Sequence, residues 1–153
     1  MANTFIGVLR SKNFLRLWIG QVASQLAFNV VNFVIVLHIY ELTGSSTSVS
    51  LVLIASALPS VLFGTLSGVI ADRFNFKKIL VYTSLLRFLA VIFLIFSKNN
   101  VLGLLEVVFL ISTVAQFFAP AESASIPLIV NEKKLVAANS VAVTTTYATM
   151  LLG

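Results

Sequence analysis

Five long apolar segments, separated by short polar stretches, constrain the fold of this chain more than any other feature. The segments are residues 17–40, 49–71, 79–96, 101–121 and 135–153. An α-helix rises 1.5 Å per residue, so about 20 residues cross the hydrocarbon core of a bilayer. Helices are the only open-ended elements that pair every backbone group within the segment. The pattern therefore predicts an all-α, polytopic integral membrane helical bundle, preceded by an N-terminal stretch at residues 1–16.

The composition excludes several other classes of protein. Of the 153 residues, 59% are hydrophobic and only 10% are charged, whereas soluble domains average about 25% charged residues. The net charge of +5 does not indicate nucleic acid as a partner, because the basic residues form short clusters between apolar segments. The chain has no Cys and one His. Without a recognisable catalytic motif or a metal-ligand set, we expect no enzyme activity, no catalytic residue, no metal and no cofactor.

The distribution of Lys and Arg predicts the orientation in the membrane. Only Lys98 falls on one side, and Arg87 lies within a segment. The other eight of the ten basic residues fall on the opposite side: Arg10, Lys12, Arg16, Arg73, Lys77, Lys78, Lys133 and Lys134. The positive-inside rule places that side in the cytoplasm. We therefore expect a multi-pass protein of the plasma membrane, here a bacterial inner membrane, with a cytoplasmic N-terminus.

Four amide side chains share one face of the first segment. Gln21, Gln25, Asn29 and Asn32 are spaced four, four and three residues apart, which keeps them within one sector of a helix. Amides are costly against lipid, so this face meets protein or water. Two interpretations stay open: the face is a candidate wall of a transport cavity, or it forms hydrogen bonds to a neighbouring helix.

Two further patterns lie within the apolar segments. In the second segment, small residues recur every four positions and predict close helix packing; they are Ser56, Ser60, Gly64 and Gly68. In the third segment, Arg87 is about 12 Å past Ile79 along the helix and is a candidate buried charge. Glu106, in the fourth segment, is a second candidate. The partner of Arg87 is Glu106 or Glu122, and the pair is either structural or coupled to substrate or protons.

The polar loop between the second and third segments resembles the signature loop of the major facilitator superfamily. Gly68, Asp72, Arg73, Lys77 and Lys78 match its pattern, and Asn75 stands in place of its second Gly. Asn tolerates left-handed backbone angles, so we expect the turn to be kept. The runs "LPSVLFGTLSGVIADRF" and "FFAPAESASIPLIV" are similar to the branch that holds macrolide-type and siderophore exporters. We expect Pro120 and Pro127, within the latter run, to break or kink the chain.

The resemblance implies a partial N-terminal half of a major facilitator fold, with about five of twelve helices. It implies export of a small amphipathic compound across the bilayer by alternating access, with H⁺ as a candidate coupling ion and a C-terminal half needed for transport. Within that scheme, the signature loop acts as a conformational latch, with Glu122 as its acidic partner. The alternative is a truncated fragment that does not transport, or a structural partner of a separately encoded remainder.

Overall fold

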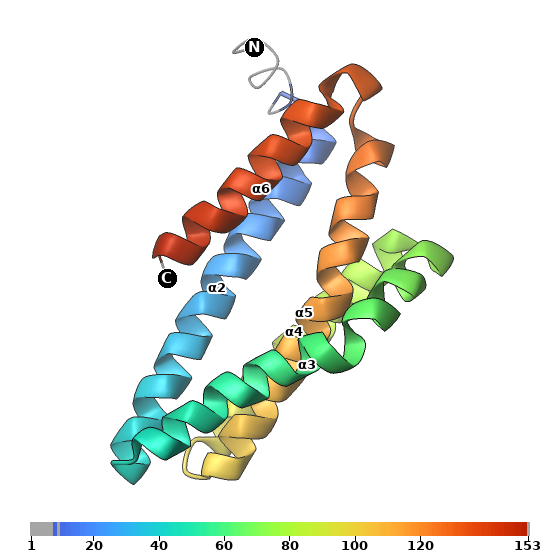
Figure 1. Ribbon diagram of the computed structural model, residues 1–153. Helices are drawn as coiled ribbons and strands as arrows, with labels where there is room; N and C mark the ends of the chain where they lie inside the picture. The colour runs from blue at the N-terminus through green and yellow to red at the C-terminus, as the bar shows by residue number, and fades with distance from the viewer. Residues whose placement is uncertain (1–7, 9, 153) are drawn as a thin grey trace. The chain divides into compact units, whose positions relative to one another are not determined.

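The computed structural model describes residue 8 and residues 10–152, which form helices joined by short connections (Figure 1). The helices are α2 (Lys12–Thr43), α3 (Ser46–Arg73), α4 (Phe76–Ser97), α5 (Val101–Ile129), the 3₁₀ turn η1 (Glu132–Lys134) and α6 (Leu135–Leu152). No strand occurs in this part of the chain. Four of the helices, α2 to α5, are long and apolar enough to cross a membrane. The predicted all-α membrane fold is therefore confirmed. Residues 1–7 and 9 of the predicted N-terminal stretch, and residue 153 of the fifth predicted segment, lie outside the described part.

The helices extend beyond the apolar segments from which they were predicted. Helix α2 begins at Lys12, and α5 continues through Pro120 and Pro127 to Ile129. Neither proline breaks the helix, which is continuous through both. Each proline removes only one backbone donor, whereas ending the helix in an apolar surrounding would leave several groups unpaired.

A glycine makes the tight connection between α2 and α3 possible. Gly44 has a φ of +61°, and its N–H donates to the carbonyl of Tyr40 over 2.8 Å. A left-handed residue just after a helix satisfies one of the last free carbonyls, and glycine adopts that conformation without a steric cost. Helix α3 can therefore start at Ser46, two residues later.

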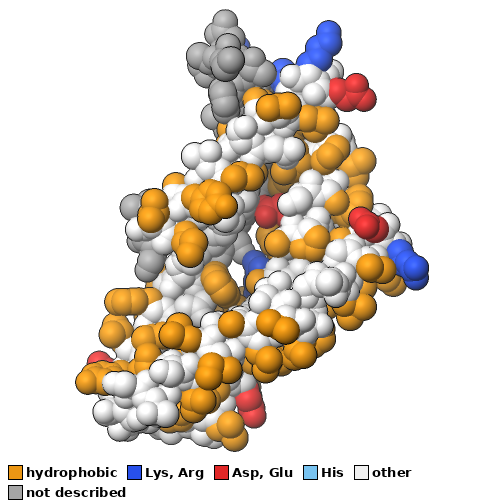
Figure 2. Space-filling view, viewed as in Figure 1, with side chains coloured by type: hydrophobic (Ala, Val, Ile, Leu, Met, Phe, Trp, Pro, Cys, Tyr) orange, Lys and Arg blue, Asp and Glu red, His pale blue; other side chains and the backbone are white. Residues whose placement is uncertain are grey.

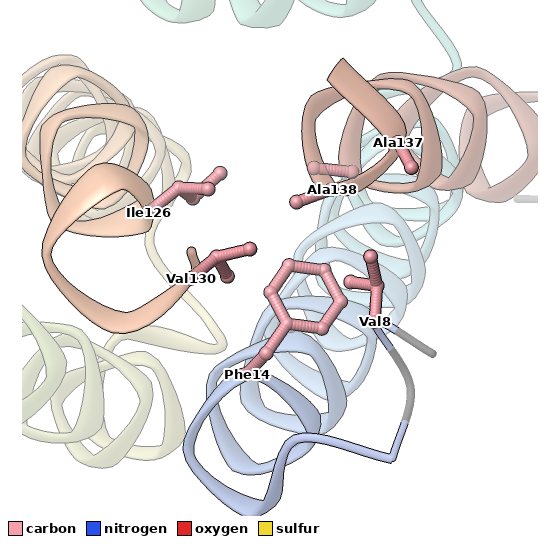
Figure 3. Close-up of a cluster of buried hydrophobic side chains, with 7 residues drawn as sticks. Val8, Phe14, Ile126, Val130, Ala137 and Ala138 are labelled. Carbon is pink, nitrogen blue, oxygen red and sulfur yellow. The ribbon is translucent and has the colours of Figure 1, made fainter. Parts of the chain in front are cut away.

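The chain divides into two compact units, Met1–Phe33 with Ser123–Gly153, and Val34–Glu122. In the first unit, the start of α2, the end of α5 and the start of α6 contribute apolar side chains that point toward one another (Figure 3). Phe14 is the largest of them and is only 1% exposed. The remaining members are Val8, Ile126, Val130, Ala137, Ala138 and Ala142.

The second unit combines the end of α2 with α3, α4 and most of α5. Its buried side chains include Ile35 and Ile39 of α2, Val52 of α3 and Leu104 of α5. The Nε2 of His38 lies 2.6 Å from the carbonyl oxygen of Lys98. Because a carbonyl oxygen only accepts, Nε2 carries the proton and donates this hydrogen bond to the turn between α4 and α5.

Many large apolar side chains face outward from the described helices. Figure 2 shows hydrophobic side chains spread over the visible surface, with few charged ones among them. Val61 and Phe96, for example, are about four-fifths exposed. Lipid, unlike water, accepts such a surface without a hydrophobic cost, so the surface agrees with a membrane-embedded chain.

Candidate functional site

The loop between α3 and α4 is short, because its charged residues belong to the ends of the two helices. Helix α3 closes when the N–H of Phe74 donates to the carbonyl of Ile70 over 3.1 Å. Asn75 then caps α4: its Oδ1 accepts from the backbone N–H groups of Lys77 and Lys78 over 3.0 and 3.4 Å. Asn75 is extended, with φ −66° and ψ 115°. The turn is therefore formed without the left-handed conformation that Asn tolerates, and the Asn75 amide serves as a helix cap.

The loop charges sit on the ends of the two helices, and all of them are exposed. Asp72 and Arg73 occupy the last turn of α3, while Lys77 and Lys78 occupy the first turn of α4. A helix dipole favours cations at the C-terminus and anions at the N-terminus. Only Arg73 follows that preference. The other three charges do not stabilise the helices that carry them.

A cationic side chain of α4 is held by two residues of α5 within the second unit. The Cζ of Arg87 lies 4.4 Å from the ring centroid of Phe118, at a distance that gives a cation–π interaction. Glu122 follows Phe118 by four residues, one helical turn away, and interacts electrostatically with Arg87. Glu122 is only 7% exposed. Of the two acids considered for Arg87, the structure places Glu122 beside it.

Glu106 has a different setting from the one expected. It is exposed on the surface of this chain, so the expectation of a buried charge is wrong for it. Glu106 is only five residues past the start of α5 at Val101, while Arg87 lies near the middle of α4. The Arg87–Glu122 interaction also gives the predicted latch acid a partner inside the second unit.

The amide face of α2 meets the hydroxyl groups of α6 in the first unit. The Nε2 atoms of Gln21 and Gln25 donate to Oγ1 of Thr146 over 3.3 and 3.1 Å. In return, Oγ1 of Thr149 donates to Oε1 of Gln25 over 2.7 Å. Asn29 donates to the backbone carbonyl of Thr149 over 2.7 Å. These four bonds, which we call the α2–α6 ladder, support interhelical hydrogen bonding for Gln21, Gln25 and Asn29.

The last amide of the face is not part of that ladder. The Nδ2 of Asn32 donates to the carbonyl of Phe28, one turn earlier in the same helix, over 2.8 Å. Asn32 is half-buried. Its hydrogen bond to its own backbone satisfies one donor while leaving the amide oxygen as an acceptor.

The sequence analysis did not predict which residues meet the amide face of α2. Trp18 extends the α2–α6 ladder by donating from Nε1 to Oγ1 of Thr145 over 2.9 Å; its position three residues before Gln21 was the available signal. The threonines of α6 gave a weaker signal, because hydroxyl groups in a helix commonly bond to their own backbone. Thr145 does so as well, donating to the carbonyl of Val141 over 2.7 Å.

The stripe of small residues in α3 does not receive a neighbouring helix in this part of the chain. Apart from the adjoining backbone of α3 itself, no described atom lies within 4 Å of the position that a Cβ would take at Gly64 or Gly68. Ser56 and Ser60 donate their hydroxyl groups to the carbonyls of Leu53 and Ala57 in their own helix. The predicted close packing on this stripe is therefore not found among the described residues.

Comparison with known proteins identifies the family. Residues 3–149 match the family described as transmembrane secretion effector. Macrolide efflux protein A of Streptococcus pyogenes is 30% identical over 126 residues, which cover 80% of this chain and 31% of the relative. Two MFS-type transporters of Bacillus subtilis (strain 168), both described as uncharacterized, are also similar. YjbB is 30% identical over 138 residues, which cover 87% of this chain and 34% of the relative. YkuC is 28% identical over 125 residues, which cover 80% of this chain and 29% of the relative.

The chain thus spans about a third of the length of the curated relatives it matches. No solved structure matches it. The family match covers nearly every described residue, including the α3–α4 loop, the Arg87–Glu122 interaction and the α2–α6 ladder. The chain therefore belongs to the transmembrane secretion effector family of the major facilitator superfamily.

Proposed function

We propose that this chain is the N-terminal part of a secondary active transporter that exports a small amphipathic compound by alternating access. The observation that carries the proposal is the α3–α4 loop. Its charges are exposed, and three of the four oppose the helix dipoles. Charges that weaken their own helices by a few tenths of a kcal/mol each are explained if they bind a second group of helices in one state of the transporter.

The latch in this proposal is Asp72 with the basic residues of the loop. Gly68 precedes it by one turn and is open to approach by another chain segment. Glu122 was expected to bind the loop cations, but Arg87 interacts with it inside the protein. We therefore assign Glu122 to fixing α4 against α5, which holds α4 in place while Arg73, Lys77 and Lys78 engage partners from the rest of the transporter.

Of the four residues of the amide face, we propose that only one lines the substrate path. Gln21, Gln25 and Asn29 already bond to α6, so their role is to position that helix. Asn32 bonds only within its own helix, and we propose that it faces the transport cavity. The coupling ion in this scheme is H⁺, and transport requires a second bundle of helices against which this one can rock.

The relatives' names support export as the direction of transport. One relative is a macrolide efflux protein, and two are transporters of the same superfamily. The alternative is a fragment that inserts without transporting or that pairs with a separately encoded remainder. Sequencing the gene past the codon for Gly153 separates the two: transport requires a continuing frame or a second gene that supplies about seven further helices.

The latch is tested in the longer protein that contains this chain. Asp72→Asn should raise the cellular accumulation of a fluorescent amphipathic substrate toward that of cells lacking the transporter, with the amount of protein in the membrane unchanged. Glu132→Gln removes a charge from η1, which is not part of the loop, and serves as the matched control. Unchanged efflux by Asp72→Asn would remove the support for the latch.

A further inference from the structure

The charges of this chain are divided unequally between its two compact units. The first unit, Met1–Phe33 with Ser123–Gly153, contains five cationic side chains and a single carboxylate, that of Glu132. The second unit, Val34–Glu122, contains five cationic side chains and four carboxylates. Most of the net charge of +5 therefore belongs to the first unit. Its cations are Arg10, Lys12, Arg16, Lys133 and Lys134.

The fold gathers these five cations at one end of the first unit, which we call the basic end. The apolar cluster around Phe14 joins the start of α2 to the end of α5 and the start of α6, so the two basic segments lie at the same end (Figure 1). Figure 2 shows Lys and Arg side chains around the turn that leads into α6. Lys134 is half-buried and the other four cations are exposed. Cations far apart in the sequence thus contribute to one surface.

An apolar strip of α2 continues from the basic end toward the bilayer centre. Lys12 and Arg16 are one helical turn apart and precede the apolar segment that begins at Leu17, so they lie at the depth of the lipid headgroups. Steps of three and four residues keep positions on one face of a helix. The positions that follow on this face are apolar and exposed, and they are Ile19, Ala23, Leu26 and Val30. Two cations followed by an apolar strip match the head and the acyl chains of a phospholipid.

Water alone leaves the cations of the basic end to repel one another. Each of them is hydrated, but like charges on one surface destabilise it, and the first unit supplies only Glu132 as a counter-charge. In a bilayer, phospholipid headgroups surround this depth whichever way the chain is oriented. The basic end therefore meets either zwitterionic or anionic headgroups, and only an anionic headgroup offsets the repulsion.

We propose that the basic end of the first unit selects an anionic phospholipid of the phosphatidylglycerol class. The lipid phosphate binds at Lys12 and Arg16, the acyl chains run along the apolar strip of α2, and Arg10 and Lys133 extend the positive surface. A phosphatidylcholine headgroup carries an ammonium group as well as a phosphate, and the same cations repel that ammonium group. The proposal concerns the lipid around the protein and is separate from the compound proposed for export.

The chain carries its own reporter for this lipid. Trp18 is the only Trp in the sequence, lies two residues past Arg16 and is half-buried in the first unit. The full chain is reconstituted in phosphatidylcholine vesicles that contain a fixed fraction of phosphatidylglycerol or phosphatidylcholine with brominated acyl chains, which quench indole fluorescence on contact. The binding constant from quenching should be about fivefold higher for phosphatidylglycerol, the change that one cation near an anionic headgroup brings. Raising the salt concentration should lower this preference, because exposed charges are screened.

Paired variants separate the basic end from the overall charge of the chain. Lys12→Gln with Arg16→Gln should remove most of the preference for phosphatidylglycerol, and Lys133→Gln alone should lower it by a smaller factor. Lys77→Gln with Lys78→Gln removes the same number of charges from the second unit and should keep the preference. An equal loss from the two double variants would overturn the proposal, because the lipid would then follow net charge.

Two measurements on the native chain complete the test and require no variant to fold. Equal quenching by the two brominated lipids would show that the basic end does not select its lipid, and the proposal would be wrong. Inorganic phosphate, compared with chloride at the same ionic strength, should leave the preference unchanged. If phosphate abolishes it, the basic end binds a free anion and not a lipid. Export is measured on the longer protein through Asp72→Asn, so failure of one proposal is distinguishable from failure of the other.

Discussion

Arg87 shows how a charge is accommodated within an apolar helix at the residue scale. The guanidinium is placed over Phe118 and interacts with Glu122, so neither the charge nor the long side chain faces lipid alone. Breaking a buried pair by removing one partner typically costs 3–5 kcal/mol, because the other charge stays buried and uncompensated. The pair thus joins one face of α4 to α5.

Arg87→Leu should therefore lower the free energy of unfolding by about 3 kcal/mol, because it leaves the buried Glu122 without its counter-charge. The measurement is unfolding in mixed detergent followed by circular dichroism. The double variant Arg87→Leu with Glu122→Leu should recover most of the loss. Arg73→Leu, an exposed charge, should change stability by less than about 0.5 kcal/mol. Equal effects of the two single variants would show that the interaction is not structural.

Asn75 gives a second prediction at this scale, because its amide caps α4. Asn75→Ala should destabilise the chain by about 1 kcal/mol, and Asn75→Gly by only a few tenths. Both variants are compared in the same unfolding experiment. Glycine is the residue that the resembling signature loop carries at this position. A loss from Gly as large as that from Ala would contradict the capping role.

At the scale of the elements, α6 depends on α2 for its polar side chains. Thr149 is 5% exposed, and its hydroxyl bonds to Gln25 as well as to its own helix. A helix that carries Asn139, Ser140 and several threonines inserts weakly when its polar groups meet lipid. The α2–α6 ladder supplies partners for them and so links insertion of the later helix to the presence of the earlier one.

Thr149→Val should reduce insertion of α6, since it removes the hydroxyl while keeping the shape of the side chain. An interhelical hydrogen bond of this type contributes about 1 kcal/mol, which is roughly a fivefold change in the ratio of inserted to non-inserted helix. Glycosylation of a tag fused after Gly153 reports the ratio. Thr144→Val is the matched control, because Thr144 is exposed on the same helix. Equal insertion of the two variants would contradict the role of the ladder.

At the scale of the whole molecule, orientation decides which loop can act as a latch. The chain has no Cys, so single cysteines report accessibility without background. We predict that Asn75→Cys is protected from a membrane-impermeant maleimide in intact cells, because the basic loops face the cytoplasm. Asn99→Cys, in the turn between α4 and α5, should be labelled. The opposite pattern would invert the proposed topology.

Much of the architecture follows from the sequence alone. Apolar length and the positions of polar turns predicted helices where α2 to α6 are found, because a membrane leaves the backbone few other ways to pair its groups. The all-α fold and the superfamily were confirmed. Helix ends were less accurate: α5 continued through Pro120 and Pro127, since hydropathy marks the hydrocarbon boundary and does not mark where the helical hydrogen bonds stop.

What the sequence determined about this protein is therefore one-dimensional: the approximate positions of the helices, their polar faces and the loop that carries the family resemblance. Only the tertiary structure decided which side chains meet, since Gln25 and Thr149 are 124 residues apart and Arg87 had two acids in reach. Spacing along a helix fixes which residues share a face. The residue that this face meets depends on how distant helices pack, and a single periodic pattern carries no information about that.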